Sequence, residues 1–452
     1  MERFSTIFIV LMLIALLSFN SSFAQINWIK HPNPVLSPGD SGAWDDLHVI
    51  IASVISLNDT LHMWYDANHG DENTGSAASG PNGVGHAIST DGISWIKDTL
   101  NPVLTPGPAS WESCWVGQVS VLYNTSDSLL HMWYAGRGNC NNYQPVYIGH
   151  ATSQDGSNWT KDSDWALGPG SSGQWDDDAL SGPEVIVVND TLHMWYDGYK
   201  LGQIPPKTGH AISTDWITWE KDPANPVLEP GSVQDWDYPH VRDARVICID
   251  DTFHMFYNGG DHPNYDIGYA QSSNGSNWVK YDESTTTENP YMNSDPVLKR
   301  GPAGSWDEDG VWTGSVLFND NSDSLRMWYS GGRNLAPQIG YATAFFDPPD
   351  IIPTGIEDTF LGGFPKEYEL KHNYPNPFNP ATNIEFSITK SEFVELRVYN
   401  ILGKEVLTVV SKKLDQGNNT YTFSGKNLAS GIYYYQLIAG EYREVKKMIL
   451  LR

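Results

Sequence analysis

The sequence predicts an all-β protein: a five-bladed β-propeller followed by a small C-terminal β-sandwich of the Ig-like kind. Three observations lead to this prediction. One aromatic word recurs five times, at steps of 61 to 72 residues, and each copy contains strand-like runs bounded by turns. The fifth copy lacks a last run that the N-terminus can supply. Four strands per repeat, repeated along the chain, are the signature of propeller blades.

The recurring word is Leu-His-Met-Trp-Tyr at residues 61–65, 130–134 and 192–196, with variants at 253–257 and 325–329. A Trp-Asp or Trp-Glu start and an apolar run precede it. A Gly-His-Ala or Gly-Tyr-Ala strand follows, then in most copies an Asp-Gly or Asn-Gly hairpin turn. Because its aromatic residues recur in every copy, we expect them to pack between blades rather than to bind a ligand, as we do for the repeated His62, His131, His193 and His254.

The two ends of this repeat region complement each other. The fifth copy passes from Ala342 into Asp347-Pro348-Pro349 without a fourth strand. Residues 26–36 resemble the fourth strand of the first copy, residues 95–104. We therefore expect the N-terminus to form the outer strand of the last blade, which hides sheet edges that would otherwise be sticky. A parallel solenoid is the alternative fold, but it would leave this strand exchange unexplained.

The N-terminal segment has the pattern of a signal peptide. Residues 4–17 are almost wholly apolar, and Ser22 and Ala24 are small residues at the two positions that a signal peptidase reads. The run is too short for a comfortable membrane span, so removal of residues 1–24 is expected, with a retained anchor as the alternative. No second apolar stretch of spanning length occurs, so we expect no transmembrane segment in the mature chain.

The charge argues against some classes of partner, and the cysteines allow one disulfide. The net charge is −27, and residues 366–452 are basic, with 12 Lys and Arg against 9 Asp and Glu, so the acidic excess lies upstream. Such a field opposes nucleic acid and anionic membranes. Cys114 and Cys140 lie in one repeat and could pair, whereas Cys248 sits in an apolar strand and is expected to be a buried free thiol.

No cofactor is expected. Two acidic runs, residues 176–178 and 307–309, could hold Ca²⁺ through oxygen ligands, but such runs are more often solvated loop ends.

The C-terminal region has a different character. Residues 373–382 read NYPNPFNPAT, residues 398–403 VYNILG, residues 428–434 LASGIYY and residues 446–450 KKMIL. In this order, ending at the C-terminus, these words resemble the sorting domain of type IX secretion cargo. The resemblance implies passage through the outer membrane and release or attachment at the surface, with the secretion machinery as partner of residues 367–452. An ordinary adhesion-type sandwich is the alternative. Residues 25–346 then form the propeller and 347–366 a linker.

The repeat words also resemble a family. Trp-Tyr-x-Gly, Gly-His-Ala-x-Ser-x-Asp-Gly-x-x-Trp and Asn-Pro-Val-Leu-x-Pro-Gly are similar to words of the five-bladed glycosidase superfamily, which includes glycoside hydrolase families 43 and 32 and the family 130 mannoside phosphorylases. The Ser-x-Asp-Gly-x-x-Trp turns at 89–95 and 153–159 also resemble the sialidase Asp-box, but are one residue shorter. The resemblance implies a poly- or oligosaccharide as partner.

The family 43 resemblance implies three catalytic carboxylates on successive first strands. Aligned on Val54, Val121, Val185, Val246 and Val316, those positions fall on Ile51, Gln118 and Ser181. None of the three is a carboxylate, so family 43 chemistry in its usual layout is not expected.

The fourth repeat offers a different candidate. Asp243 stands at the expected carboxylate position between Arg242 and Arg245, and Arg-Asp-Ala-Arg resembles the Arg-Asp-Pro of family 32. Two arginines would lower the pKa of this carboxyl, although a buried ion pair that braces the axis is an equal alternative. Glu184 is the second non-repeating carboxylate near the axis.

Several further residues are candidates for substrate binding. In a family 130-like arrangement His240, Arg242 and Arg245 would hold phosphate. Trp115, Trp312 and Tyr238 depart from the repeat and could stack on sugar rings.

Three functions therefore stay open for a protein expected outside the cell or at its surface. They are a glycosidase-like enzyme acting on polysaccharide, a non-catalytic glycan-binding propeller, and a structural or protein-interaction propeller. Two carboxylates converging in an open funnel would favour the first, exposed aromatic residues without that pair the second, and an axis filled by side chains the third.

Overall fold

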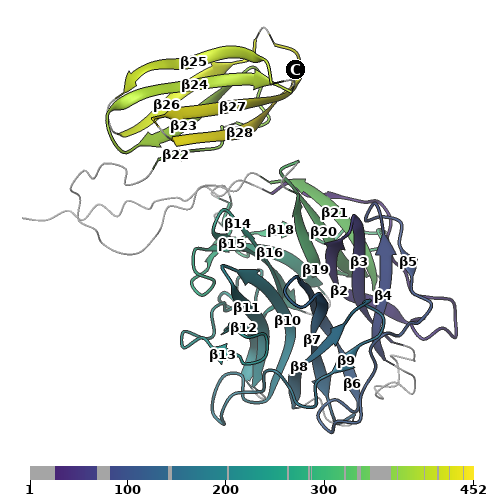
Figure 1. Ribbon diagram of the computed structural model, residues 1–452. Coiled ribbons are helices and arrows are strands. Elements are labelled where there is room, and N and C mark those ends of the chain that lie inside the picture. The colour runs from purple at the N-terminus through teal and green to yellow at the C-terminus, as the bar shows by residue number, and fades with distance from the viewer. Residues whose placement is uncertain are drawn as a thin grey trace, which may run out of the picture. The chain divides into compact units, whose positions relative to one another are not determined.

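The computed structural model describes residues 26–346 apart from 69–81, 141–144, 201–202, 262–263, 284–285, 287, 320–321 and 333–336, and residues 368–451 apart from 374, 402, 415–416, 427 and 441. The chain divides into two compact units, Met1–Pro353 and Thr354–Arg452. Every regular element of the described residues is a strand (Figure 1). The predicted signal peptide and the predicted linker lie outside the described residues.

In the N-terminal unit, each copy of the aromatic word is the second strand of an antiparallel four-strand repeat. Repeat 1 consists of β2 (His48–Leu57), β3 (Thr60–Asn68), β4 (Gly83–Ser89) and β5 (Ile96–Lys97). Repeat 2 consists of β6 (Trp115–Asn124), β7 (Leu129–Arg137), β8 (Val146–Ser153) and β9 (Thr160–Lys161). Repeat 3 consists of β10 (Ala179–Val188), β11 (Thr191–Lys200), β12 (Gln203–Ser213) and β13 (Glu220–Lys221).

The last two repeats vary this plan. Repeat 4 consists of β14 (His240–Ile249), β15 (Thr252–Asp261), β16 (Asn264–Ser272) and β17 (Val279–Lys280), with β18 (Pro296–Leu298) also paired to β16. Repeat 5 consists of β19 (Gly310–Asn319), β20 (Ser324–Gly332), β21 (Gln338–Phe345) and β1 (Ile29–Lys30). Repeats 2 and 3 share one sheet through a single parallel pair, Val146 with Ala179.

The N-terminal strand completes repeat 5, as the sequence predicts. Ile29 lies opposite Thr343 and Lys30 opposite Ala342. Lys30 Nζ also contacts Asp307 Oδ2 at 2.6 Å, and the same Lys-to-carboxylate pair joins the fourth strand to the Trp-Asp or Trp-Glu start in every other repeat (Lys97–Asp45, Lys161–Glu112, Lys221–Asp176, Lys280–Asp237). The strand exchange therefore closes the N-terminal unit with the same polar lock that each continuous repeat uses.

The first strands of the repeats form a closed circle. β2 packs against β6, β6 against β10, β10 against β14, β14 against β19, and β19 against β2 again. Residues on the first strands are therefore the ones that face a common axis.

The aromatic word forms the core between repeats. Trp64, Trp133, Trp195 and Trp328 are fully buried, as are the tyrosines that follow them. In three cases the indole Nε1 donates to the glycine carbonyl of the neighbouring repeat's Asp-Gly or Asn-Gly turn, at 2.8–2.9 Å. The prediction that these residues pack between repeats is confirmed.

The C-terminal unit consists of two sheets that share one core. One sheet contains β22 (Glu369–Leu370), β23 (Ala381–Ile388) and β26 (Gly417–Ser424); the other contains β25 (Glu405–Leu414), β24 (Glu392–Asn400), β27 (Gly431–Ala439) and β28 (Tyr442–Leu450). Side chains from both sheets, among them Phe386, Phe423, Leu396 and Leu437, are buried in one cluster.

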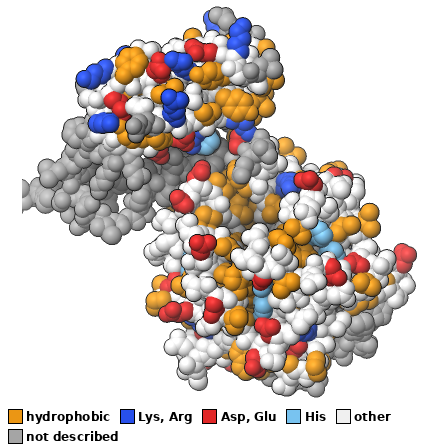
Figure 2. All heavy atoms as spheres, in the orientation of Figure 1, with side chains coloured by type: hydrophobic (Ala, Val, Ile, Leu, Met, Phe, Trp, Pro, Cys, Tyr) orange, Lys and Arg blue, Asp and Glu red, His pale blue; other side chains and the backbone are white. Residues whose placement is uncertain are grey.

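The cysteines of the N-terminal unit differ in state. Cys114 and Cys140 form a disulfide, which confirms their predicted pairing. Cys248 is a free thiol, but it is only half-buried: it lies at the second-last residue of β14 and packs on the margin of the repeat core. Asp and Glu side chains outnumber Lys and Arg on the visible face of the N-terminal unit in Figure 2. Among the described residues, none lies in a helix with the length and apolar character that a membrane crossing needs.

Candidate functional site

A bulge interrupts the first strand of every repeat at the same place. The register with the second strand shifts between Ile50 and Ser53 in β2, and at the corresponding positions in β6, β10, β14 and β19. Four residues in these bulges have positive φ: Ile51 (46°), Gln118 (52°), Gly182 (55°) and Asp243 (51°). Such a backbone is strained for any residue other than glycine, and bulges of this kind re-aim side chains beside functional sites.

The bulges correct the sequence alignment in repeat 3. By strand register, Ser181 corresponds to Ile50, so the residue that matches Ile51 and Asp243 is Gly182 rather than Ser181. Ile51, Gln118 and Asp243 stand three residues before their aligned valines, whereas Ser181 stands four residues before Val185, so the position in repeat 3 was assigned one residue too early. The conclusion that three successive family 43 positions lack a carboxylate is unchanged.

An upper ring of hydrogen bonds links these bulges around the axis. The amide of Ile51 donates to Ser330 Oγ, that of Thr313 to Asn258 Oδ1, and that of Asp243 to Asp197 Oδ1. The amide of Gly182 donates to Gln118 Oε1, and that of Gln118 is bonded to the Asp66 carboxylate. Asp66, Asp197, Asn258 and Ser330 all follow directly after the repeated aromatic word.

A lower ring lies two residues further along each first strand. The amides of Val54, Val121 and Val185 donate to Ser315, Ser53 and Ser120, each at 3.0 Å. In repeats 3 and 4 the serine is replaced by Glu184 and Arg245 respectively. Glu184 accepts from the Val246 amide, and Arg245 donates to the Gly314 carbonyl, which completes the circle.

Glu184 and Arg245, two of the predicted site residues, are therefore neighbours in the lower ring. Arg245 is almost fully buried, donates to Glu184 Oε2 at 3.3 Å and also reaches the Pro183 and Ala244 carbonyls. Burial raises the pKa of Glu184 to about 7, and the Arg245 charge offsets part of that rise. In the guanidinium predicted as a phosphate ligand, Nε and Nη1 bind protein acceptors, whereas Nη2 is buried without a hydrogen-bond partner among the described residues.

Asp243, the other predicted catalytic residue, faces a second carboxylate. Both Asp243 and Asp197 are fully buried. A Cβ placed on Gly182 would lie 2.7 Å from Asp197 Oδ2 and 3.2 Å from Asp243 Oδ1, so the two oxygens are separated by no more than the sum of these distances, about 5.9 Å. Among the described residues, neither oxygen has a hydrogen-bond partner. Both oxygens therefore lie against the backbone of Gly182, so close that a side chain at this position would clash with Asp197.

The environment of this pair favours one retained proton. Burial is the largest cause that raises the pKa of Asp197 well above its usual range, and the Asp243 carboxylate raises it further. Arg242 Nε binds Asp243 Oδ2 at 3.0 Å, and Asn258 Nδ2 donates to the same oxygen at 2.8 Å. Two carboxyl groups at this separation in a buried site cannot both ionise easily.

The predicted binding residues do not all lie at one place. His240 lies 3.4 Å from the Tyr265 hydroxyl, and the Tyr265 and Trp312 rings are 6.0 Å apart. Trp115 and Tyr199 pack on one small cluster with Val146 and Ala179. Tyr238 lies on the loop before β14, with a side chain 36% exposed. The structure thus groups His240, Arg242 and Asp243 with Trp312 through Tyr265.

Four residues of this cluster are absent from the sequence prediction: Asp197, Tyr199, Tyr265 and Asp66. A signal for two of them exists in the sequence. The residue after the aromatic word is Asp66, Ala135, Asp197, Asn258 and Ser330 in the five repeats, so it varies where its neighbours do not. Burial raises the pKa of Asp66 to about 7, as expected for a carboxyl taken out of water.

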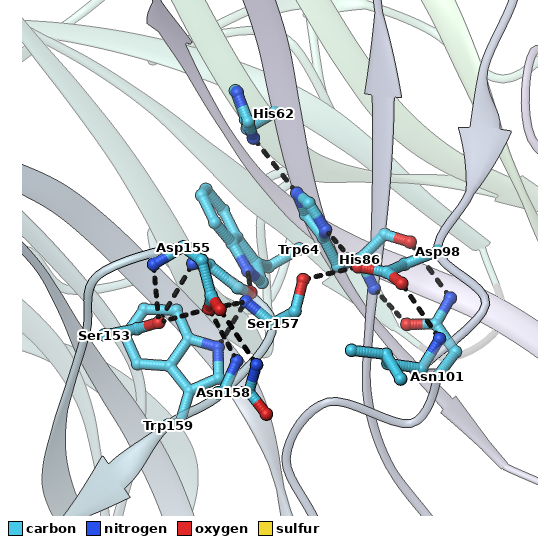
Figure 3. Close-up of polar contacts among 12 residues, drawn as sticks. His62, Trp64, His86, Asp98, Asn101, Ser153, Asp155, Ser157, Asn158 and Trp159 are labelled. Atoms are coloured by element: carbon cyan, nitrogen blue, oxygen red, sulfur yellow. Dashed lines mark hydrogen bonds and ion pairs between the residues drawn. The ribbon is translucent and has the colours of Figure 1, made fainter.

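The repeated histidines lie elsewhere and form relays within and between repeats. His62 Nδ1 lies 3.1 Å from His86 Nε2, and His86 Nδ1 lies 3.0 Å from Asp98 Oδ2. Asp98 then accepts from Ser157 in the turn of repeat 2, as Figure 3 shows. In the same turn Asp155 accepts from the Ser157 and Asn158 amides, and Ser153 Oγ from that of Gly156. The Asp-box-like turns thus tie one repeat to the next.

The two acidic runs considered for Ca²⁺ hold cationic side chains. Asp176 accepts from Lys221 and from Tyr196, and Asp177 from Lys200. Asp307 accepts from Lys30 and Tyr329. The described residues contain no group of three or more His, Cys, Asp or Glu side chains placed to hold a metal ion.

Known proteins resemble both units. Residues 131–297 match the family described as Glycosyl hydrolases family 32 N-terminal domain, and residues 372–451 match the Secretion system C-terminal sorting domain. An uncharacterized protein of Mycobacterium tuberculosis is 27% identical over 254 residues, which cover 53% of this chain and 77% of that protein.

Solved structures resemble the N-terminal fold. A glycosyl hydrolase from Bacteroides ovatus has a TM-score of 0.52 and 18% identity, covering 73% of this chain and 97% of its own. A second belongs to the family 130 mannoside phosphorylases, which contains glycoside hydrolases that target β-1,2 mannosidic linkages in Candida mannan; it has a TM-score of 0.51 and 16% identity, covering 73% and 98%. The protein therefore combines a glycoside hydrolase-like propeller with a C-terminal sorting domain that marks it for type IX export to the cell surface or the extracellular space.

Proposed function

We propose that the exported protein is a glycoside hydrolase that cleaves an extracellular poly- or oligosaccharide at the Asp197–Asp243 pair. The observation that supports this most strongly is the convergence of two buried carboxyl oxygens on Gly182, neither of which has a hydrogen-bond partner among the described residues. Glycoside hydrolysis needs one protonated carboxyl at the leaving oxygen and usually a second carboxylate for the water or the anomeric carbon.

The two carboxyl groups take different roles in this proposal. Asp197, whose pKa is raised, keeps the proton and acts as general acid. Asp243, placed by the strained bulge and bonded to Arg242, acts as the second carboxylate. Their limit of about 5.9 Å is nearer to the roughly 5–5.5 Å typical of retaining enzymes than to the separations of inverting ones. The reaction would then retain the anomeric configuration.

The substrate would bind against the neighbouring rings. Trp312, Trp115 and Tyr238, which are partly exposed, are candidates for stacking, and His240 and Arg242 for bonds to sugar hydroxyl groups. Glu184, with Arg245, is assigned to bracing the axis rather than to catalysis, because the other lower-ring positions are serines with that task.

A second candidate function is a non-catalytic glycan-binding propeller. The observation that favours it is the complete burial of both carboxyl groups. In that case Asp197 and Asp243 would only hold Arg242 in place for ligand binding.

The finer architecture belongs to the same proposal. The closed circle of first strands and the five copies of the aromatic word support a five-bladed propeller over residues 25–346. The two sheets on one core support an Ig-like sandwich over residues 367–452. A signal peptide at 1–24 and a linker at 347–366 complete the proposed organisation.

The test is release of reducing sugar from a panel of plant, algal and fungal polysaccharides by the mature protein. Asp197→Asn and Asp243→Asn should each lower the rate about 10²–10⁴-fold while keeping the native circular dichroism spectrum. Glu184→Gln is the comparison variant: it removes a lower-ring carboxylate that pairs with Arg245, so any loss of its activity should accompany a loss of the native circular dichroism spectrum. No release by the native protein, together with slowed migration in a polysaccharide gel, would replace this proposal by the binding propeller.

A further inference from the structure

Repeat 2 displays an aromatic pair that no other repeat has among the described residues. The rings of Tyr147 on β8 and Trp165, in the loop after β9, lie 4.6 Å apart at an angle of 31°. Trp165 is 45% exposed, whereas the tryptophans of the aromatic word are fully buried. The loop therefore presents an exposed indole beside a tyrosine ring of β8.

The alignment by strand pairing shows that both rings replace other residue types. The third strand pairs with a buried leucine in every repeat: Leu36, Leu104, Leu167, Leu228 and Leu298. Two residues before that leucine stand Pro34, Pro102, Pro226 and Pro296, but Trp165 in repeat 2. At the position of Tyr147 the other repeats have Gly83, Lys207, Asp266 and Gln338.

A third replacement in repeat 2 makes room for the indole. Gly168 stands where the other repeats have Ser37, Thr105, Glu229 and Lys299. A Cβ on Gly168 would lie 3.0 Å from Trp165 Nε1 and 3.5 Å from the Tyr147 ring, so the glycine admits both rings. Three coordinated changes in one repeat indicate a built surface rather than one stray residue.

In two other repeats the corresponding residues form polar pairs. Ser37 donates to Gln338 at 2.6 Å in repeat 5, and Lys207 pairs with Glu229 at 2.8 Å in repeat 3. Repeat 2 has aromatic rings at the place of these pairs. The fold of a repeat therefore does not depend on aromatic rings at these positions.

The pair is held firmly from behind. Tyr147 makes an edge contact with Trp111, which is buried and stacks on Tyr134. The Cys114–Cys140 disulfide joins the segment that follows Trp111 to the end of the second strand. A platform that is rigid before binding loses little conformational entropy when a ligand covers it.

The platform is separate from the Asp197–Asp243 pair. Val146 and Tyr147 are consecutive residues of β8, so their side chains point to opposite faces. Val146 packs with Trp115 and Tyr199, beside the candidate active site, while Tyr147 packs with Trp111 and Trp165.

We propose that Tyr147 and Trp165 form a second carbohydrate-binding site, which takes a pyranose ring of a neutral polysaccharide against the exposed indole. Flat aromatic faces match the CH face of a pyranose. Asp164 is exposed beside the indole, and the Asp162 side chain is about half exposed, so carboxylate acceptors for sugar hydroxyl groups are at hand. The same carboxylates oppose an anionic polysaccharide. The choice of a glycan as the ligand rests on the proposed function, but binding at this site does not require catalysis.

The test is affinity electrophoresis of the full mature chain in gels that contain hydroxyethyl cellulose, glucomannan or galactomannan, with alginate and pectate gels for comparison. We expect retardation in at least one neutral gel and none in the anionic gels. Trp165→Ala should weaken the retarding affinity at least tenfold, and Trp165→Phe should keep most of it. Tyr123→Ala, which removes a comparably exposed ring from β6, should leave it unchanged.

The outcomes separate this site from the proposed catalytic pair. Asp197→Asn should lose sugar release and keep retardation, whereas Trp165→Ala should lose retardation and keep release from short soluble oligosaccharides. Retardation that depends on Trp165 in a protein without hydrolytic activity would sustain this site and end the catalytic proposal. No retardation in any neutral gel, or retardation unchanged by Trp165→Ala, would overturn the site and point to a protein contact instead.

Discussion

Asp197 should cost the protein stability at the pH where it is proposed to act. Its pKa is raised in the folded state by burial and by Asp243. A group with a raised folded pKa contributes fully below its unfolded pKa, near 4, and loses that contribution as pH rises through the folded value. Asp197→Asn should therefore raise the free energy of unfolding at pH 8, and this gain should shrink toward pH 4.

Thermal unfolding followed by circular dichroism at the two pH values checks this prediction. An equal gap at pH 4 and pH 8 would mean that the Asp197 proton is not the cause.

Single residues also show what the sequence could and could not reveal. Asp243 breaks the repeat at an axis-facing position, so it is visible in the sequence together with Arg242 and His240. Asp197 lies 46 residues earlier, beside a word whose strong repetition assigns its surroundings to the core. Only the contact between neighbouring repeats gives it a partner, and that contact has no periodic signature.

At the level of elements, the first strands are joined by the two hydrogen-bonded rings. Glu184→Ser would leave the buried Arg245 charge without its carboxylate, which typically costs about 3–5 kcal/mol. The double variant Glu184→Ser/Arg245→Ser restores the residue of the other lower-ring positions and should cost clearly less than the single change. Urea unfolding of the three proteins measures this, and equal losses in the single and double variants would refute the ring pairing.

The buried histidine relays predict that the stability of the fold decreases in acid. Burial lowers the pKa of His62, His86 and His210, and lowers that of His193 to about 4. Unfolded histidines take up protons near pH 6.5 while these stay neutral, so stability is full above pH 6.5 and falls as the pH drops toward 4.

The unfolding midpoint of the native protein should therefore fall over this range. His193→Gln, which removes one relay, should show a shallower fall. A native midpoint that is constant from pH 7 to pH 4.5 would contradict this origin.

Element order was predictable because turns and repeats are local signals, whereas register was not. The Asp-Gly turns, the recurring strands and the similarity of residues 26–36 to a fourth strand predicted the repeats and their closure. Each first strand contains a bulge, and in repeat 3 the strand register moves the matching position from Ser181 to Gly182. A bulge is defined by its partner strand, so the first strand alone does not reveal it.

For the whole molecule, the two units should separate in function as they do in structure. The N-terminal unit ends at Pro353, and the sorting-domain match begins at residue 372. A chain without residues 372–451 should fold and keep its activity on sugars but stay inside the cell that makes it. Fractionation of cells that express the two forms tests this, and normal export of the shortened chain would contradict the role of the tail.

The fold brings Asp197 and Asp243 from neighbouring repeats into one site. The central claim is that these two carboxyl groups act together in catalysis. The measurement is the rate of sugar release by the native protein, by Asp197→Asn, by Asp243→Asn and by the double variant. Groups that act as one unit are strongly non-additive, so the double variant should be no slower than the slower single variant. Losses that multiply in the double variant, or single variants as active as the native protein, would show that the two carboxyl groups are not a catalytic pair.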